Sequence, residues 1–185
     1  MIFRISAALL AATSLAGAAS AQSTIVVGDS AAASCYQHAV NQRSDRMALS
    51  ACDTALDSMT TRRSDRPKTF VNRAVIYLHM GRAEMALSDL EAAARLDFDA
   101  PELYLNYSAA YIRLSRFNEA VTAATRAING EYHALHQAYY NRAVAYENLG
   151  NVAAAYRDLQ TASELAPDWP LPQRELERYQ IRPAS

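Results

Sequence analysis

The feature that most constrains this chain is a segment that recurs about every 34 residues. Three similar stretches end at Tyr77, Tyr111 and Tyr146, and the spacings between these tyrosines are 34 and 35 residues. A second amphipathic segment follows each stretch, so each unit is interpreted as two helices joined by a turn. Such a hairpin cannot bury its apolar faces alone, whereas stacked copies bury a continuous core. The repeat therefore predicts an all-α fold, an α-solenoid of antiparallel helix pairs.

The repeats share two motifs. The first helix carries an aromatic residue, then a pair of residues, then a tyrosine, and the second helix carries small residues around a central position. The first-helix motif occurs as Phe70, Arg73-Ala74, Tyr77, as Tyr104, Tyr107-Ser108, Tyr111, and as Tyr139, Arg142-Ala143, Tyr146. The second-helix motif occurs as Ala86-Leu90-Ala93, Ala120-Ala124-Ala127 and Ala155-Leu159-Ala162. With these motifs the chain resembles tetratricopeptide repeat proteins, in three repeats over residues 67–100, 101–135 and 136–169. It departs from the family at Arg73 and Arg142, where the family has Leu, and at Ser115, which replaces the turn glycine found at Gly81 and Gly150.

The segments on either side of the regular repeats are interpreted as caps. Residues 31–66 form a degenerate helical hairpin and linker, because Ala48, Cys52 and Ala55 keep the second-helix spacing. Residues 22–30 are a lead-in, and residues 170–185 are a C-terminal capping helix and tail. A solenoid needs such atypical terminal units to stay soluble.

The first 21 residues have the pattern of a secretory signal peptide. The amine and Arg4 supply positive charge, residues 5–15 are an apolar run, and Ala19-Ser20-Ala21 has the small-x-small form of a cleavage site. We expect cleavage between Ala21 and Gln22. The alternative, a membrane anchor, is disfavoured because the run is short for crossing the hydrocarbon core. The prediction is an exported protein, periplasmic or secreted, with no stable membrane insertion after cleavage.

The chain has two cysteines, Cys35 and Cys52. In an oxidising compartment two cysteines of one domain usually pair. The midpoint between them falls in the polar turn at residues 43–46, so two helices that fold back there bring both sulfurs to the same height. We predict a Cys35–Cys52 disulfide; the alternative is two buried free thiols.

Composition and motifs exclude several function classes. The net charge of −1 and the pI of about 6.4 do not favour nucleic-acid binding. No phosphate-binding loop or hydrolase motif is present. His133 and His136 lack a third ligand for a metal site. We therefore predict no catalytic residue, no metal and no cofactor, and a protein that is not an enzyme.

The resemblance implies that the first helices line a groove that binds a peptide or helix of a partner protein. Asn72, Asn106 and Asn141 recur at the same repeat position and could form a row of amides that holds a ligand backbone; alternatively, they are structural and bond to adjacent helices. The predicted groove residues are Lys68, Val71, Asn72, Val75, His79, Leu105, Asn106, Ala109, Arg113, Tyr140, Asn141, Val144 and Asn148. The predicted function is an envelope scaffold or adaptor. The alternatives are a structural or self-associating solenoid and an accessory subunit of an envelope enzyme.

Overall fold

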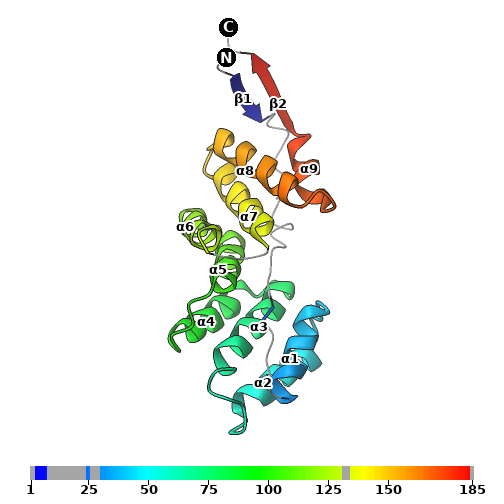
Figure 1. The fold of residues 1–185 in the computed structure, drawn as a ribbon, viewed down its shortest axis with the longest axis vertical. Coiled ribbons are helices and arrows are strands. Elements are labelled where there is room, and N and C mark those ends of the chain that lie inside the picture. Colours follow the sequence, from blue (N-terminus) through cyan, green and yellow to red (C-terminus); the bar gives the residue numbers. More distant parts are fainter. Residues whose placement is uncertain (1–2, 8–23, 26–29, 131–133, 184–185) are drawn as a thin grey trace.

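The computed structural model describes residues 3–7, 24–25, 30–130 and 134–183. Its helices pair into four antiparallel hairpins that stack along the long axis of the molecule, with a short helix at the end (Figure 1). These hairpins are α1 (Ser30–Val40) with α2 (Arg46–Asp57), α3 (Arg66–His79) with α4 (Ala83–Ala94), α5 (Pro101–Arg113) with α6 (Phe117–Ile128), and α7 (Leu135–Asn148) with α8 (Val152–Leu165). The short helix is α9 (Pro170–Leu176). The predicted α-solenoid of helix pairs is confirmed.

The first helices of the hairpins form a continuous layer. Helix α3 contacts α1 and α5, and α5 contacts α7, while each second helix packs on its own partner and on the first helix that follows. The small residues of the second-helix motif let the helices approach closely, since Ala86, Ala120 and Ala155 are fully buried. The layer of first helices is therefore the surface that runs through all the repeats.

The three regular repeats, α3–α4, α5–α6 and α7–α8, share the same turn between their helices. Gly81, Ser115 and Gly150 adopt positive φ angles of 72°, 57° and 77° at equivalent positions. In the second repeat the N–H of Arg116 donates to the carbonyl of Tyr111 at 2.8 Å and that of Ser115 to Ile112 at 3.0 Å. This pair of bonds is the Schellman motif, which satisfies the last carbonyls of a helix.

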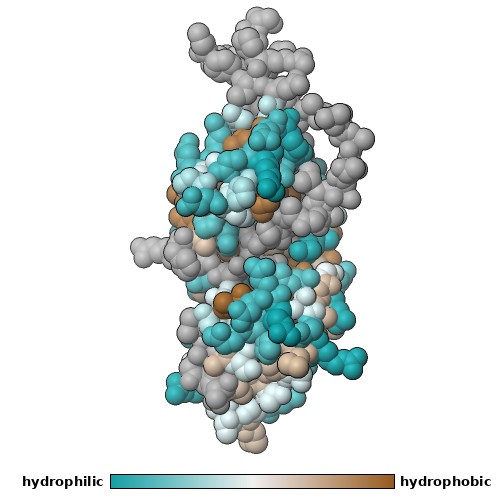
Figure 2. Space-filling model, turned by 90° about the vertical axis from the view of Figure 1, so that its right-hand side faces the viewer, coloured by the Kyte–Doolittle hydropathy of each residue, from teal (hydrophilic) through white to brown (hydrophobic). Residues whose placement is uncertain are grey.

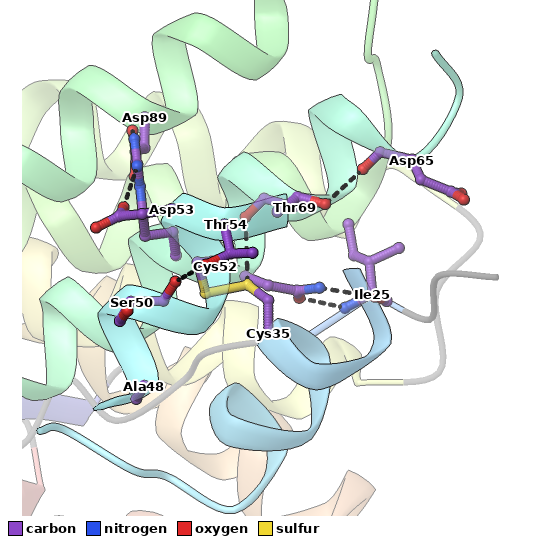
Figure 3. Close-up of a disulfide and its surroundings, with 12 residues drawn as sticks. Ile25, Cys35, Ala48, Ser50, Cys52, Asp53, Thr54, Asp65, Thr69 and Asp89 are labelled. Carbon is purple, nitrogen blue, oxygen red and sulfur yellow. Dashed lines mark hydrogen bonds and ion pairs between the residues drawn. A yellow bond between two sulfur atoms is a disulfide. The ribbon is translucent and has the colours of Figure 1, made fainter. Parts of the chain in front are cut away.

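A disulfide closes the N-terminal hairpin, as the sequence predicts. Cys35 of α1 and Cys52 of α2 are bonded, with Cα atoms 4.5 Å apart, and both residues are fully buried (Figure 3). Asp45 begins α2 as its N-cap, since its side chain accepts the N–H of Ala48 at 2.9 Å. The cysteines pack with Val75 and Ile76, so the bonded hairpin is joined to the first regular repeat through a shared apolar cluster.

Two short strands at the chain ends form a feature that the sequence did not predict. Strand β1 (Phe3–Ala7) pairs antiparallel with β2 (Tyr179–Pro183), with Phe3 opposite Pro183 and Ala7 opposite Tyr179. Strand β1 lies within the predicted signal peptide, and β2 lies in the segment interpreted as a capping helix and tail. Residues 8–23, with the predicted cleavage site at Ala21 and Gln22, lie outside the described residues. Among the residues that the structure describes, no helix is long and apolar enough to cross a membrane.

Candidate functional site

The predicted groove residues lie on α3, α5 and α7, and most of them are buried. Lys68, His79 and Arg113 are partly exposed and Asn148 is exposed. The buried members are Val71, Asn72, Val75, Leu105, Asn106, Ala109, Tyr140, Asn141 and Val144. Of the predicted groove residues, those that reach the surface are thus polar or basic, while the apolar ones belong to the core. Whether these residues bind a partner stays a prediction.

Two of the three recurring asparagines bond within the solenoid. Asn106 donates from Nδ2 to the carbonyl of Glu102 in its own helix at 3.0 Å. Asn141 donates from Nδ2 to Ser108 Oγ at 2.9 Å, and this bond ties α7 to α5. Both side chains are fully buried. At these two positions the geometry favours the structural alternative.

Asn72 is different, because it holds a chain segment that belongs to no helix. Its Oδ1 accepts the N–H of Ile25 at 2.8 Å, and its Nδ2 donates to the carbonyl of Ile25 at 2.9 Å. The Ile25 side chain packs against the apolar cluster that contains Val71 and Leu78. Figure 3 shows Ile25 beside α3, with both hydrogen bonds drawn. One carboxamide thus satisfies both backbone groups of one residue.

Ile25 is a site residue that was not predicted from the sequence, since residues 22–30 were interpreted only as a lead-in. The signal that could have found it is the apolar run Ile25-Val26-Val27 between polar neighbours. A short β-branched run in a polar segment favours an extended chain packed on an apolar surface.

His79 and Arg113 form the basic part of the layer. Burial lowers the pKa of His79 below its ordinary value, and the positive charge of Arg113 lowers this pKa further. Burial also lowers the pKa of Arg113. Within the described part of the chain, Nδ1 of His79 is buried and has no hydrogen-bond partner. His79 is therefore held neutral in the folded protein over a wider pH range than a free histidine.

The arginines that depart from the family pattern make ion pairs between helices. Arg73 donates two bonds to the carboxylate of Asp89, both 2.7 Å, and Arg142 bonds to Asp158 at 2.7 and 2.9 Å. Burial alone would lower the pKa of Arg73, but the bonds and charge of Asp89 raise it above its ordinary value. Each guanidinium also lies near the rings of the two motif aromatics of its repeat, at 5.3–5.8 Å. These arginines join the first and second helix of repeats one and three.

The second repeat lacks this pair and has a pocket instead. Tyr107 and Ala123 stand where the other repeats have Arg and Asp. The ring of Tyr107 lies 6.2 Å from that of Tyr104 and 5.8 Å from that of Tyr111, and burial raises the pKa of Tyr107 to about 12. The pocket has a volume of about 500 Å³. Residues that line it include Tyr104, Tyr107, Tyr111, Asn118, Thr122 and Arg126.

The described residues form no metal site, and the coloured part of the face in Figure 2 has no large apolar patch. Among the residues that the structure describes, no group of three or more His, Cys, Asp or Glu side chains could hold a metal ion. The face shown in Figure 2 is mostly hydrophilic in its coloured part, with only small separate apolar areas. A protein partner that binds this face would therefore contact a mixed surface rather than a single apolar patch.

The comparisons with known proteins agree with the repeat architecture. Residues 67–99 and 136–169 each match a model described as tetratricopeptide repeat. The matched segments are the two repeats that carry the Arg–Asp pair. No curated protein matches the chain. The matches support a tetratricopeptide repeat protein, and such repeats generally mediate protein–protein interaction.

Proposed function

We propose that this chain is an exported interaction module that binds a peptide or helix of a partner protein along α3, α5 and α7, as a scaffold or adaptor of the cell envelope. The observation that carries the proposal is the contact between Asn72 and Ile25. The carboxamide bonds to both backbone groups of Ile25 at 2.8 and 2.9 Å, and the isoleucine side chain rests on the apolar cluster of α3 and α5. This is the arrangement that a groove needs to hold an extended peptide.

The contact also defines the class of peptide. Bonds to the backbone N–H and C=O do not depend on the side chain, so they supply affinity without sequence specificity. Specificity then comes from the surface beneath the side chain, which belongs to the apolar cluster that contains Val71, Leu78 and Leu103 and accepts an aliphatic group. We infer a partner segment with an aliphatic side chain at the residue that Asn72 holds.

The proposal is tested by selecting peptides from a random display library on the full chain and measuring the dissociation constant of the best peptide. We expect Asn72→Ala to weaken its binding at least tenfold, because both backbone bonds are lost. Asn129→Ala is the matched control: Asn129 is exposed at the end of α6, and its replacement should leave binding unchanged. Melting curves verify that each variant is folded. Selected peptides that bind Asn72→Ala as tightly as the unaltered chain would contradict the proposal.

Export is tested separately by the intact mass of the protein released from its source cells. We expect a chain that begins at Gln22, since Ala21 closes the cleavage motif. A protein that still carries Met1 and sediments with membranes would contradict export. That result would leave the peptide-binding proposal standing.

A further inference from the structure

We propose that Thr24 and Ile25 act as an intramolecular ligand of the solenoid, so that an external peptide has to displace them from Asn72 before it binds. This inference rests on the proposed function and adds a means of regulating it. The residue that is bound at Asn72 belongs to the same chain: the N–H and C=O of Ile25 make hydrogen bonds to the carboxamide of Asn72.

The first observation is that this contact engages both polar atoms of the Asn72 carboxamide. Asn72 uses Oδ1 as an acceptor and Nδ2 as a donor toward the same residue, and its side chain is fully buried. A second peptide cannot make these two bonds while Ile25 makes them. Occupation by Ile25 and by an external peptide is therefore mutually exclusive at this position.

The second observation is that Thr24 and Ile25 make a small contact with the residues that the structure describes. Thr24 and Ile25 lie outside any helix or strand and are only partly buried. Among the described residues, the backbone of Ile25 makes two hydrogen bonds to Asn72, and its side chain contacts one apolar cluster. A contact of two hydrogen bonds and one side chain is of the size that a competing peptide can replace.

The third observation is the short connection to the solenoid. Ile25 precedes the start of α1 at Ser30 by five residues. A short tether gives an intramolecular ligand a local concentration on the order of millimolar. A peptide of the same sequence in solution should therefore bind about tenfold or more weakly while the intramolecular contact is intact.

Removal of the predicted signal peptide would leave this contact close to the new N-terminus of the chain. Ile25 lies four residues after the predicted cleavage bond between Ala21 and Gln22. After cleavage, Thr24 and Ile25 would stand near a free N-terminus, attached to the solenoid from one side alone. The intramolecular ligand would then be in competition with any partner segment that the exported protein meets.

The test uses the full chain and a fluorescent synthetic peptide with the sequence of residues 22–29, blocked at both ends. Ile25→Pro removes the N–H that Asn72 Oδ1 accepts, since proline has no backbone donor. We expect Ile25→Pro to bind the peptide at least tenfold more tightly than the unaltered chain, as measured by fluorescence anisotropy. Thr24→Pro is the matched control, because it places a proline next to the contact but keeps the N–H of Ile25, and its affinity should stay near that of the unaltered chain.

A second measurement keeps the inference testable if Ile25→Pro does not fold. In the unaltered chain, the amide of Ile25 should exchange slowly with solvent deuterium, and Asn72→Ala should make it exchange at the rate of an unprotected amide. Fast exchange at Ile25 in the unaltered chain would overturn the inference.

The outcomes also separate this inference from the proposed function. Equal and measurable affinity in the unaltered chain and Ile25→Pro would overturn the intramolecular ligand, while showing that the groove binds peptides. Absence of binding in both chains would overturn the inference as well. In that case the peptides selected from the library, with their dependence on Asn72, would still decide the proposed function.

Discussion

At the scale of single residues, Ser115 occupies a backbone position that favours glycine. Its φ of 57° matches those of Gly81 and Gly150 in the other repeats. The left-handed region costs a residue other than glycine about 1–2 kcal/mol, and glycine itself costs about 0.5–1 kcal/mol in chain entropy. We therefore expect Ser115→Gly to raise the free energy of unfolding by about 0.5–1 kcal/mol, measured by urea titration.

The matched control for this prediction is Gly150→Ala. An added Cβ at Gly150 meets no atom within 4 Å, so any cost of the substitution comes from the backbone angle of 77°. This variant should lose about 1–2 kcal/mol of stability. A Ser115→Gly chain that is no more stable than the unaltered one would contradict the argument.

His79 gives a prediction about pH. Burial and the charge of Arg113 lower the pKa of His79 in the folded chain, whereas in the unfolded chain the residue titrates near its ordinary value of about 6.5. The unfolded state therefore binds more protons in the window between these two values, and stability falls as the pH is lowered through it. Above about pH 6.5 the residue is neutral in both states and contributes no pH dependence.

We expect His79→Gln to show a smaller loss of stability between pH 7.5 and pH 5.5 than the unaltered chain, in thermal melts recorded across that range. Glutamine keeps a polar side chain of similar length but does not titrate, so it removes only the protonation step. Identical pH profiles for the two chains would show that His79 is not the residue that titrates.

At the scale of helices, the ion pairs and the pocket show how one repeat differs from its neighbours. Arg73 with Asp89 and Arg142 with Asp158 join the two helices of their repeats, whereas Tyr107 and Ala123 leave a pocket of about 500 Å³. Tyr107→Arg alone would place a guanidinium beside half-buried rings without its carboxylate, and Ala123→Asp alone would bury a carboxylate without its partner. Each single change should cost about 1–3 kcal/mol.

The double variant Tyr107→Arg with Ala123→Asp should lose less stability than the sum of the single variants. We expect a coupling energy of about 0.5–3 kcal/mol from a double-mutant cycle in urea, because the two residues would restore the pair that the other repeats have. Single-variant effects that simply add would show that the second repeat cannot accommodate the pair.

The sequence predicts the helices well, since the repeat spacing fixes both their number within a unit and the turn between them. It also predicts the disulfide, because the two cysteines stand at equal distances from a polar turn. It fails for features that depend on distant parts of the chain. The pairing of β1 with β2 joins the two ends of the chain, and neither strand carries a local signal for it.

The candidate site shows the same limit. The spacing of Asn72, Asn106 and Asn141 places them correctly on one layer, but it does not say what covers them. Asn141 bonds to Ser108, and Asn72 bonds to Ile25 from 47 positions earlier in the chain. The repeat spacing determines the helix face on which a side chain lies. Its burial depends on the segments that the fold brings against that face.

At the scale of the whole molecule, the disulfide should contribute to the stability of the solenoid through its first hairpin. The bond joins residues 17 positions apart, and closing a loop of this size contributes about 3 kcal/mol in the chain-entropy model. We expect the double variant Cys35→Ala, Cys52→Ala to melt at a lower temperature than the oxidised chain. The alanines are small enough for the fully buried positions of both cysteines.

The control for this prediction is a reducing agent. It should lower the melting temperature of the unaltered chain and leave that of the double variant unchanged. Two reactive thiols in the native, unreduced chain would contradict the presence of the bond.

The disulfide also makes the two ends of the solenoid differ in their resistance to unfolding. Each hairpin is supported by the elements that pack against it. Helices α7 and α8 have α5 and α6 on one side and α9 on the other. At the N-terminal end the hairpin is covalently closed, whereas at the other end α8 is followed by α9, a helix of 7 residues, and a two-stranded pair. Thermal opening, or a pulling force on the chain, should therefore begin at α7 and α8 and proceed toward the N-terminus. The solenoid would therefore open from its C-terminal end. Asn72 lies in the repeat next to the disulfide-bonded hairpin, so its contacts would be lost last.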